Sequence, residues 1–383
     1  MKVSSTLLLP ARPRVSAMVI PFVIGLLALA MGGVWSTCVG WVVAPPLTAR
    51  LAGTTSPRVV FALADGNVVK VDAVSGAVLA RQPHLPSTML PSLAVSSDGR
   101  SVFVLEIQWQ GASPNGRLSV LSADTLWPQV TVPADSYAQD GVALAVTSDD
   151  RTVVIYHEHP FPGTSPDYWL SYFDRQSGHL LAAQTGLPGC GSGGQLIPMA
   201  SQLAVLCRGT DDVRIVDLGS QEVVRTISLL PVPKSNRAGG ALAAGTIPGS
   251  SALAVLLDDG QLLRLDPTRQ SVSQVADLAP ERGRVVPIGG AVFSQTGRAV
   301  IALSNSAADW SVGRASTLLV VDLVTGQVMS RLAQVSQYGI SITPDGQRAF
   351  LRTQPLGELF ALDLGTHRAL PFGPAHANEL AFS

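Results

Sequence analysis

Short apolar runs separated by polar turn residues cover the chain from about residue 58 to its end. Runs of four to eight residues rich in Val, Leu and Ala predict β-strands rather than helices. One element recurs as an apolar strand, a turn such as Ser-Asp-Gly, and a second strand. Its clearest copies occupy residues 93–105, 142–156 and 340–351, with weaker copies at 242–249 and 291–297. Each copy predicts an antiparallel β-hairpin.

A second element also recurs, as a strand that ends in aspartate, a tight turn and another strand. Its aspartates are Asp72, Asp174, Asp217, Asp266, Asp322 and Asp363, and residues 121–126 form a degenerate seventh copy. An aspartate at the end of a strand can accept hydrogen bonds from backbone N–H groups two residues later. We therefore interpret these carboxylates as turn caps and assign no chemistry to them.

The two elements alternate with a period of about 48 residues, which is enough for four short strands per repeat. Four strands at this period predict one blade of a β-propeller. The count of copies gives seven blades. The first repeat lacks its opening strand, whereas residues 379–383 read as an opening strand with nothing after it. We therefore predict an all-β, seven-bladed β-propeller over residues 58–383, closed by pairing of the C-terminal strand with the first blade.

Residues 339–350 (GISITPDGQRAF) and 319–328 (LVVDLVTGQV) resemble the YVTN-type β-propeller repeat. That superfamily also includes lactonase-like propellers and the heavy chains of amine dehydrogenases. The resemblance covers about residues 58–383 and implies a seven-bladed fold. It implies little about activity, because members of the superfamily bind and catalyse very different things. The Gly-His and Trp-Asp signatures of WD40 repeats are absent from the chain.

The N-terminal part of the chain has a different pattern. Residues 15–49 contain no charged residue, and residues 21–44 are long and apolar enough to cross a bilayer as a helix. Lys2, Arg12 and Arg14 precede this segment, which predicts a cytoplasmic basic N-terminus (residues 1–20), a linker (residues 45–57) and a propeller outside the cytoplasm. The alternative is a signal peptide cleaved after Ala28-Leu29-Ala30, which would give a secreted protein.

Composition agrees with a folded body. The chain has 383 residues, of which 46% are hydrophobic and 14% charged, so intrinsic disorder is excluded. Because every acidic residue lies at Asp65 or later, residues 51–383 carry a net charge of about −5. A mildly acidic body offers no basic surface for a phosphate backbone, and we expect no nucleic-acid partner.

Three predicted loops between the second and third strands of a blade are long: residues 106–117, 157–168 and 305–316. Long loops on a rigid scaffold commonly carry function. They bring a candidate binding rim of Trp109, Phe161, Tyr168, Trp169 and Trp310. The alternative is that these aromatics fold back and cover the bases of their own loops.

Other chemistry is sparse. His157 and His159 are two apart in a predicted strand and could share a metal with Asp167 or Asp140, although such spacing also arises by chance. No G-x-S-x-G, S-x-x-K or H-E-x-x-H motif occurs, and the glycine-rich residues 189–194 lack the lysine of a phosphate-binding loop. We expect no cofactor.

Cys190 and Cys207 flank the first two strands of the fourth repeat. A hairpin could bring them within bridging distance, and export would permit a disulfide. Two unpaired thiols are the alternative.

The sequence thus favours a binding module over an enzyme. The expected partner is an envelope protein or an extracellular polymer held by the long loops, with the membrane contacted through the N-terminal helix. The alternative is a propeller enzyme, lactonase-like or a metal-assisted hydrolase, with its site at the mouth of the central channel.

Overall fold

The computed structural model describes the following residues: 59–64, 66–83, 92–110, 113–134, 143–159, 167–190, 194–207, 212–229, 240–257, 259–278, 287–304, 316–335, 339–352, 359–373 and 377–382. The predicted basic N-terminus, transmembrane segment and linker (residues 1–57) lie outside these residues. Within the described ranges, no helix combines the length and hydrophobicity needed to cross a bilayer.

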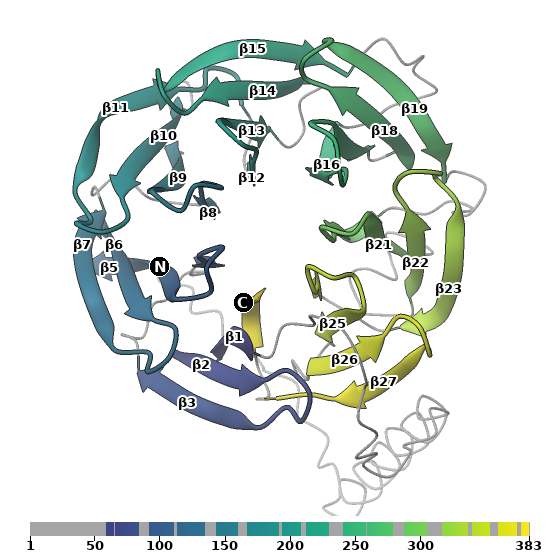
Figure 1. The fold of residues 1–383 in the computed structure, drawn as a ribbon, viewed down its shortest axis with the longest axis horizontal. Helices are drawn as coiled ribbons and strands as arrows, with labels where there is room; N and C mark the ends of the chain where they lie inside the picture. The colour runs from purple at the N-terminus through teal and green to yellow at the C-terminus, as the bar shows by residue number, and fades with distance from the viewer. Residues whose placement is uncertain are drawn as a thin grey trace, which may run out of the picture. The chain divides into compact units, whose positions relative to one another are not determined.

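The described residues form seven four-stranded antiparallel sheets arranged as blades around a ring, which confirms the all-β, seven-bladed propeller (Figure 1). From the centre outward, blade 1 contains β28 (Ala377–Phe382), β1 (Val59–Ala64), β2 (Asn67–Asp72) and β3 (Val78–Pro83). Blade 2 contains β4 (Ser92–Val95), β5 (Ser101–Gln110), β6 (Ser113–Ser122) and β7 (Pro128–Ala134). Blade 3 contains β8 (Ala143–Val146), β9 (Thr152–His159), β10 (Asp167–Asp174) and β11 (Leu180–Gly186). Blade 4 contains β12 (Gln195–Pro198), β13 (Gln202–Leu206), β14 (Asp212–Asp217) and β15 (Glu222–Ser228).

The remaining three blades follow the same plan. Blade 5 contains β16 (Ala241–Thr246), β17 (Leu253–Leu257), β18 (Gln261–Asp266) and β19 (Ser271–Asp277). Blade 6 contains β20 (Pro287–Phe293), β21 (Arg298–Ser304), β22 (Ser316–Asp322) and β23 (Val328–Val335). Blade 7 contains β24 (Gly339–Ile342), β25 (Arg348–Arg352), β26 (Leu359–Asp363) and β27 (Arg368–Pro371).

The ring closes through the C-terminal strand. β28 pairs antiparallel with β1, in a register that places Phe382 opposite Val60 and Leu380 opposite Ala62. Blade 1 therefore combines its innermost strand, from the C-terminal part of the chain, with three strands from the N-terminal part of the propeller. This is the closure expected from the two incomplete repeats, and it removes an exposed edge at the start of β1.

Each blade buries its sheet faces against its neighbours. The described residues form seven apolar clusters, and each joins two consecutive blades. Between blades 2 and 3, for example, Phe103 and Leu105 pack with Val153 and Ile155. Because side chains alternate along a strand, each middle strand supplies residues to the clusters on both of its sides.

Glycine allows close approach at one of these interfaces. An added Cβ atom at Gly245, in β16, would lie 2.3 Å from the Cβ atom of Phe293 in β20. The inner strands of blades 5 and 6 can therefore approach each other as closely as they do only because residue 245 has no side chain.

The two ends of the propeller differ. We call the end that carries the hairpins between first and second strands and between third and fourth strands the turn end. The opposite end carries the hairpins between second and third strands and the connections between blades, and we call it the loop end.

The aspartates at the turn end cap their turns. The Oδ1 atom of Asp72 accepts hydrogen bonds from the backbone N–H of Val74 at 3.1 Å and of Ser75 at 2.7 Å. The same pattern recurs at Asp217, Asp322 and Asp363. The N–H of Ser75 is the main cause of a lowered pKa at Asp72, since hydrogen bonds to a carboxylate favour its charged form.

Blades 2 and 3 are also joined at the turn end by polar contacts. Asp150 accepts hydrogen bonds from the backbone N–H groups of Ser97 and Asp98, at 2.8 and 3.1 Å. Arg175 donates to Asp98 and lies 3.6 Å from Asp150. The Ser96 hydroxyl is the main cause that lowers the pKa of Asp98 to about 2, and Arg175 contributes to the same shift.

The Gly245 contact yields the first testable prediction. Gly245→Ala forces its new methyl group against Phe293, and overpacking of this kind costs about 1–3 kcal/mol of unfolding free energy. Gly186→Ala is the matched control, because nothing lies within 4 Å of a Cβ atom added there. Urea denaturation followed by circular dichroism should show a lower midpoint for Gly245→Ala alone. Equal midpoints for the two variants would contradict the packing described here.

Candidate functional site

Two neighbouring hairpins extend the loop end. β5 and β6 have ten residues each, and their pairing continues from Ser101 opposite Ser122 to Gln110 opposite Ser113. The prediction of a loop over residues 106–117 is therefore wrong in its boundaries. Pairing persists because polar and apolar residues keep alternating through residue 110, which suits a strand.

The second extended hairpin belongs to blade 3. β9 runs to His159 and β10 starts at Asp167, and these two residues are paired. The predicted loop of residues 157–168 is thus shorter than expected, because strand pairing occupies both of its ends. The third predicted long loop, residues 305–316, lies outside the described residues except for Ser316, the first residue of β22.

An ion pair between a buried carboxylate and a half-buried arginine braces the β5–β6 hairpin. Glu106 is 1% exposed and lies opposite Arg117 in the strand register. The Nε–H of Arg117 donates to Oε2 of Glu106 at 3.0 Å, and Nη2 contacts the same oxygen. Removing Arg117 is costly, because the charge of Glu106 then stays buried without this cation. The sequence indicates this pair only if strand pairing is assumed to continue past residue 106, which places Glu106 opposite Arg117.

A stacked aromatic pair braces the β9–β10 hairpin. The rings of His157 and Trp169 lie 5.0 Å apart with an interplanar angle of 6°, and the two residues are paired in the strand register. His157 is 0% exposed. Among the described residues, neither of its ring nitrogens has a hydrogen-bond partner. Burial lowers the pKa of His157 to about 4, so the ring is neutral at pH 7.

The predicted aromatic rim is only partly described. Tyr168 is buried and stacks on Tyr156, with ring centroids 6.0 Å apart. It packs in the apolar cluster between blades 3 and 4, which is the arrangement in which an aromatic covers its own loop base. Trp169 is half-buried. Phe161 and Trp310 lie outside the described residues, as does the side chain of Trp109.

The predicted metal ligands are likewise only partly described. The side chains of His159 and Asp167 lie outside the described residues, as does Asp140. Among the residues that are described, no three His, Cys, Asp or Glu side chains are grouped so that they could hold a metal ion.

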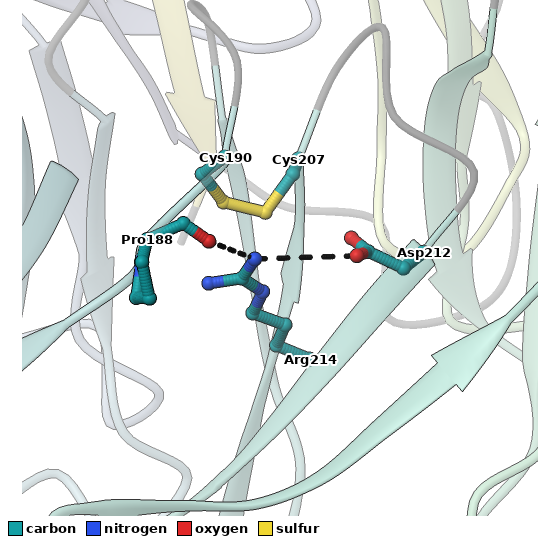
Figure 2. The surroundings of a disulfide bond; sticks show 5 residues. All are labelled: Pro188, Cys190, Cys207, Asp212 and Arg214. Carbon is teal, nitrogen blue, oxygen red and sulfur yellow. Dashed lines mark hydrogen bonds and ion pairs between the residues drawn. A yellow bond between two sulfur atoms is a disulfide. The ribbon is translucent and has the colours of Figure 1, made fainter. Parts of the chain in front are cut away.

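A disulfide joins the blade 3–4 connection to blade 4 (Figure 2). Cys190 precedes β12 and Cys207 follows β13; their sulfur atoms are bonded and their Cα atoms are 4.9 Å apart. Both cysteines are buried. Beside them, Nη2 of Arg214 donates to the carbonyl oxygen of Pro188 and lies 4.0 Å from Oδ2 of Asp212 (Figure 2).

The glycine-rich segment at residues 189–194 has a packing role at its last residue. A Cβ atom at Gly194 would lie 2.7 Å from the ring of Tyr156. The connection to blade 4 can therefore pass over the aromatic cluster of blade 3 only with glycine at this position.

The innermost strands, which surround the channel, are almost free of ionisable groups. The sequences of β4, β8, β12, β16, β20, β24 and β28 contain one such residue, Glu379. Between β12 and β16, the side-chain amide of Gln195 donates to the carbonyl of Ala244 and accepts from its N–H, each at 2.9 Å. Sequence reasoning missed this bridge, because a lone glutamine carries no signal of its partner.

Comparisons with known proteins support the fold and no specific family. No family model and no curated protein matches the chain, so the YVTN-type repeat remains a resemblance. Among solved structures, Kuenenia stuttgartiensis hydrazine synthase is 11% identical, with 87% of this chain and 100% of that chain covered and a TM-score of 0.53. Apo AztD from Citrobacter koseri is 11% identical, with coverage of 86% and 98% and a TM-score of 0.52. The β-propeller domain of Myceliophteria thermophila Cps50 (Swd1) is 14% identical, with coverage of 85% and 98% and a TM-score of 0.52.

The buried histidine predicts a pH dependence. His157 titrates near pH 6.5 in the unfolded chain and near 4 when folded, so the unfolded state binds more protons between these values. Stability therefore falls as the pH drops from 6.5 to 4, by about 3 kcal/mol in total. Carboxylates such as Asp98 cause a further loss of stability, but only in a separate pH range that begins below pH 4.

His157→Phe keeps an aromatic ring against Trp169 and cannot be protonated. Urea denaturation at pH 7 and pH 4.5 should show a smaller loss of stability for His157→Phe than for the unmodified chain. His179→Gln, at an exposed histidine, should leave the loss unchanged. An unaltered pH dependence in His157→Phe would contradict the assignment.

The disulfide predicts a thiol count and a stability change. Under denaturing, non-reducing conditions, thiol titration should find one reactive cysteine, Cys38, and three after reduction. Because the bond spans 17 residues, its removal in Cys190→Ala/Cys207→Ala should cost about 3 kcal/mol. Cys38→Ser is the control and should leave the stability of the propeller unchanged. Three reactive thiols before reduction would exclude the bond.

Proposed function

We propose that this protein is a membrane-anchored propeller, displayed outside the cytoplasm, that binds an envelope protein or an extracellular polymer through its loop end. The observation that carries the proposal is the pair of extended hairpins on blades 2 and 3. These hairpins are neighbours, because consecutive blades pack together through the cluster that contains Phe103 and Ile155. They form a candidate binding surface on one side of the loop end.

Both hairpins are held rigidly at their bases, which favours binding. The Glu106–Arg117 ion pair braces one, and the His157–Trp169 stack braces the other. Strands that are already paired lose little backbone conformational entropy when a partner binds. The aromatic residues Trp109 and Trp169 belong to these hairpins, and aromatic side chains are enriched in protein interfaces.

The composition of the channel favours a binding module over the enzyme alternative. General acid–base catalysis and metal binding both need ionisable side chains. The seven innermost strands supply only Glu379. The fold itself does not decide the question, since unrelated functions share one architecture; the structures similar to this chain include one named hydrazine synthase.

The anchoring part of the proposal depends on the sequence. Residues 15–49 carry no charge, and the basic residues Lys2, Arg12 and Arg14 precede them. This charge asymmetry favours a cytoplasmic N-terminus, with the propeller on the other side of the membrane.

A site-specific crosslinking experiment tests the binding surface. A photoreactive phenylalanine analogue replaces Gln110, at the end of β5, in the full chain expressed in its own cells. The control carries the analogue at Gln176, an exposed residue at the turn end. We expect position 110 to give a discrete crosslinked adduct and position 176 to give none.

A second variant tests whether the two hairpins contact the same partner. Replacing residues 160–166 by Asn-Gly shortens the blade 3 loop and leaves the paired residues His159 and Asp167 in place. If both hairpins contact one partner, the adduct at position 110 should fall at least tenfold. Adducts of equal yield at positions 110 and 176, or none at 110, would overturn the proposed binding surface.

A further inference from the structure

The large apolar side chains that are most exposed gather at the turn end. Among the described residues, the five with the highest exposure range from 53% to 71% and are Trp127, Val74, Val324, Leu79 and Met329. All five lie in or directly after the hairpin between the third and fourth strands of a blade. Isolated exposed apolar residues need no explanation, but a set at equivalent positions on neighbouring blades does.

These five residues lie on blades 6, 1 and 2, whereas Leu180 of blade 3 and Val224 of blade 4 are exposed to a lower fraction, 44% and 45%. Val324 and Met329 belong to blade 6, Val74 and Leu79 to blade 1, and Trp127 to blade 2. Blade 7, which lies between blades 6 and 1, contributes Leu370, which is also exposed. We call these residues, together with Val78 of blade 1, the apolar arc. Figure 1 shows its outermost strands β23, β27, β3 and β7 one after another around the ring.

The charges on the same strands have one sign. The outermost strands of the arc carry Arg81, Arg331 and Arg368, all exposed, and no acidic residue. On the other side of the ring, the outermost strands β15 and β19 carry both signs, with Glu222, Arg225 and Asp277. Apolar side chains interspersed with arginine suit the headgroup region of a bilayer, where Trp is also favoured.

The turn aspartates of the arc add negative charges beside these arginines, because their hydrogen bonds favour the ionised carboxylate. Asp72, Asp322 and Asp363 each accept hydrogen bonds from backbone N–H groups of their own turns. Asp124 is more exposed, and its carboxylate lies 3.9 Å from the ammonium group of Lys70.

The chain also enters the propeller at this end. Val59, the first residue of β1, is paired with Asp72, the residue that begins the turn carrying Val74. The predicted transmembrane segment therefore leads into the turn end of blade 1, inside the arc. A linker of residues 45–57 spans at most about 45 Å when extended, which limits how far the start of β1 can lie from the bilayer in an anchored propeller.

We infer that the apolar arc rests on the lipid headgroups of the membrane that anchors the chain. This inference rests on the anchoring part of the proposed function and adds an orientation to it: the turn end of blades 6, 7, 1 and 2 faces the bilayer, and the loop end faces away from it. The occupant of the arc is the lipid surface, rather than a second copy of the chain.

An environment-sensitive dye tests the orientation. The full chain, in a Cys38→Ser background with its disulfide intact, carries the dye NBD at Leu79→Cys, Met329→Cys or Val224→Cys. The first two positions lie in the arc. Val224 is the matched control, since it sits at the same register shift after the turn but on blade 4, away from the arc. Each protein is reconstituted in vesicles of phosphatidylcholine and phosphatidylglycerol.

We expect NBD at positions 79 and 329 to show a several-fold gain in emission, a blue shift and quenching by lipids that carry a doxyl group near the headgroup. At position 224 we expect the spectrum of an aqueous dye. Positions 79 and 329 that behave like position 224 would overturn the inference. In detergent, a blue shift that grows with protein concentration would also overturn it, by identifying a second copy of the chain as the occupant.

Alkaline carbonate extraction of the same vesicles separates this inference from the proposed function. Release of the chain by carbonate would contradict membrane anchoring. Retention of the chain with aqueous spectra at all three positions would leave the anchor in place and exclude only the orientation.

Discussion

The structure depends on the burial of both faces of every blade against neighbouring blades. A four-stranded sheet cannot cover its own faces, and here seven apolar clusters each join two consecutive blades. The ring must therefore be complete, which explains why β28 returns from the C-terminal end to pair with β1. The arrangement also fixes where function can lie: the sheet faces are used for packing, and the two ends and the outer strands remain available.

The two ends use this freedom differently. At the turn end, short turns are capped by aspartate, and one set of contacts around Asp150 and Arg175 joins blades 2 and 3. At the loop end, two hairpins project from the same two blades and are braced by Glu106–Arg117 and His157–Trp169. Blades 2 and 3 are thus tied at one end and extended at the other, which gives the projecting hairpins a firm base.

Local patterns explain what the sequence predicted and what it could not. The blades were predictable because strand patterns and the turns at residues such as Asp72 and Asp322 repeat at a fixed period, and the nearness of Cys190 to Cys207 follows from one hairpin. The burial of Tyr168 and His157 was not predictable, because it depends on side chains that face them from other strands. The Gln195–Ala244 bridge and the close approach at Gly245 likewise arise between blades, where one sequence shows no covariation.

The outermost strands illustrate a conflict between two requirements. An outermost strand exposes unpaired backbone groups and invites pairing with another chain, and a register shift that twists the strand reduces this risk. Such shifts recur at the start of β3, β7, β15 and β23, where they turn one side chain outward. At Gln129 this side chain is polar, whereas at Leu79, Met329 and, to a lower exposed fraction, Val224 it is apolar and exposed. The register shift that protects the outermost strand from pairing is thus combined, on these blades, with apolar side chains that favour leaving water. A lipid surface meets both requirements, because it covers the apolar side chains and offers no strand with which the edge could pair.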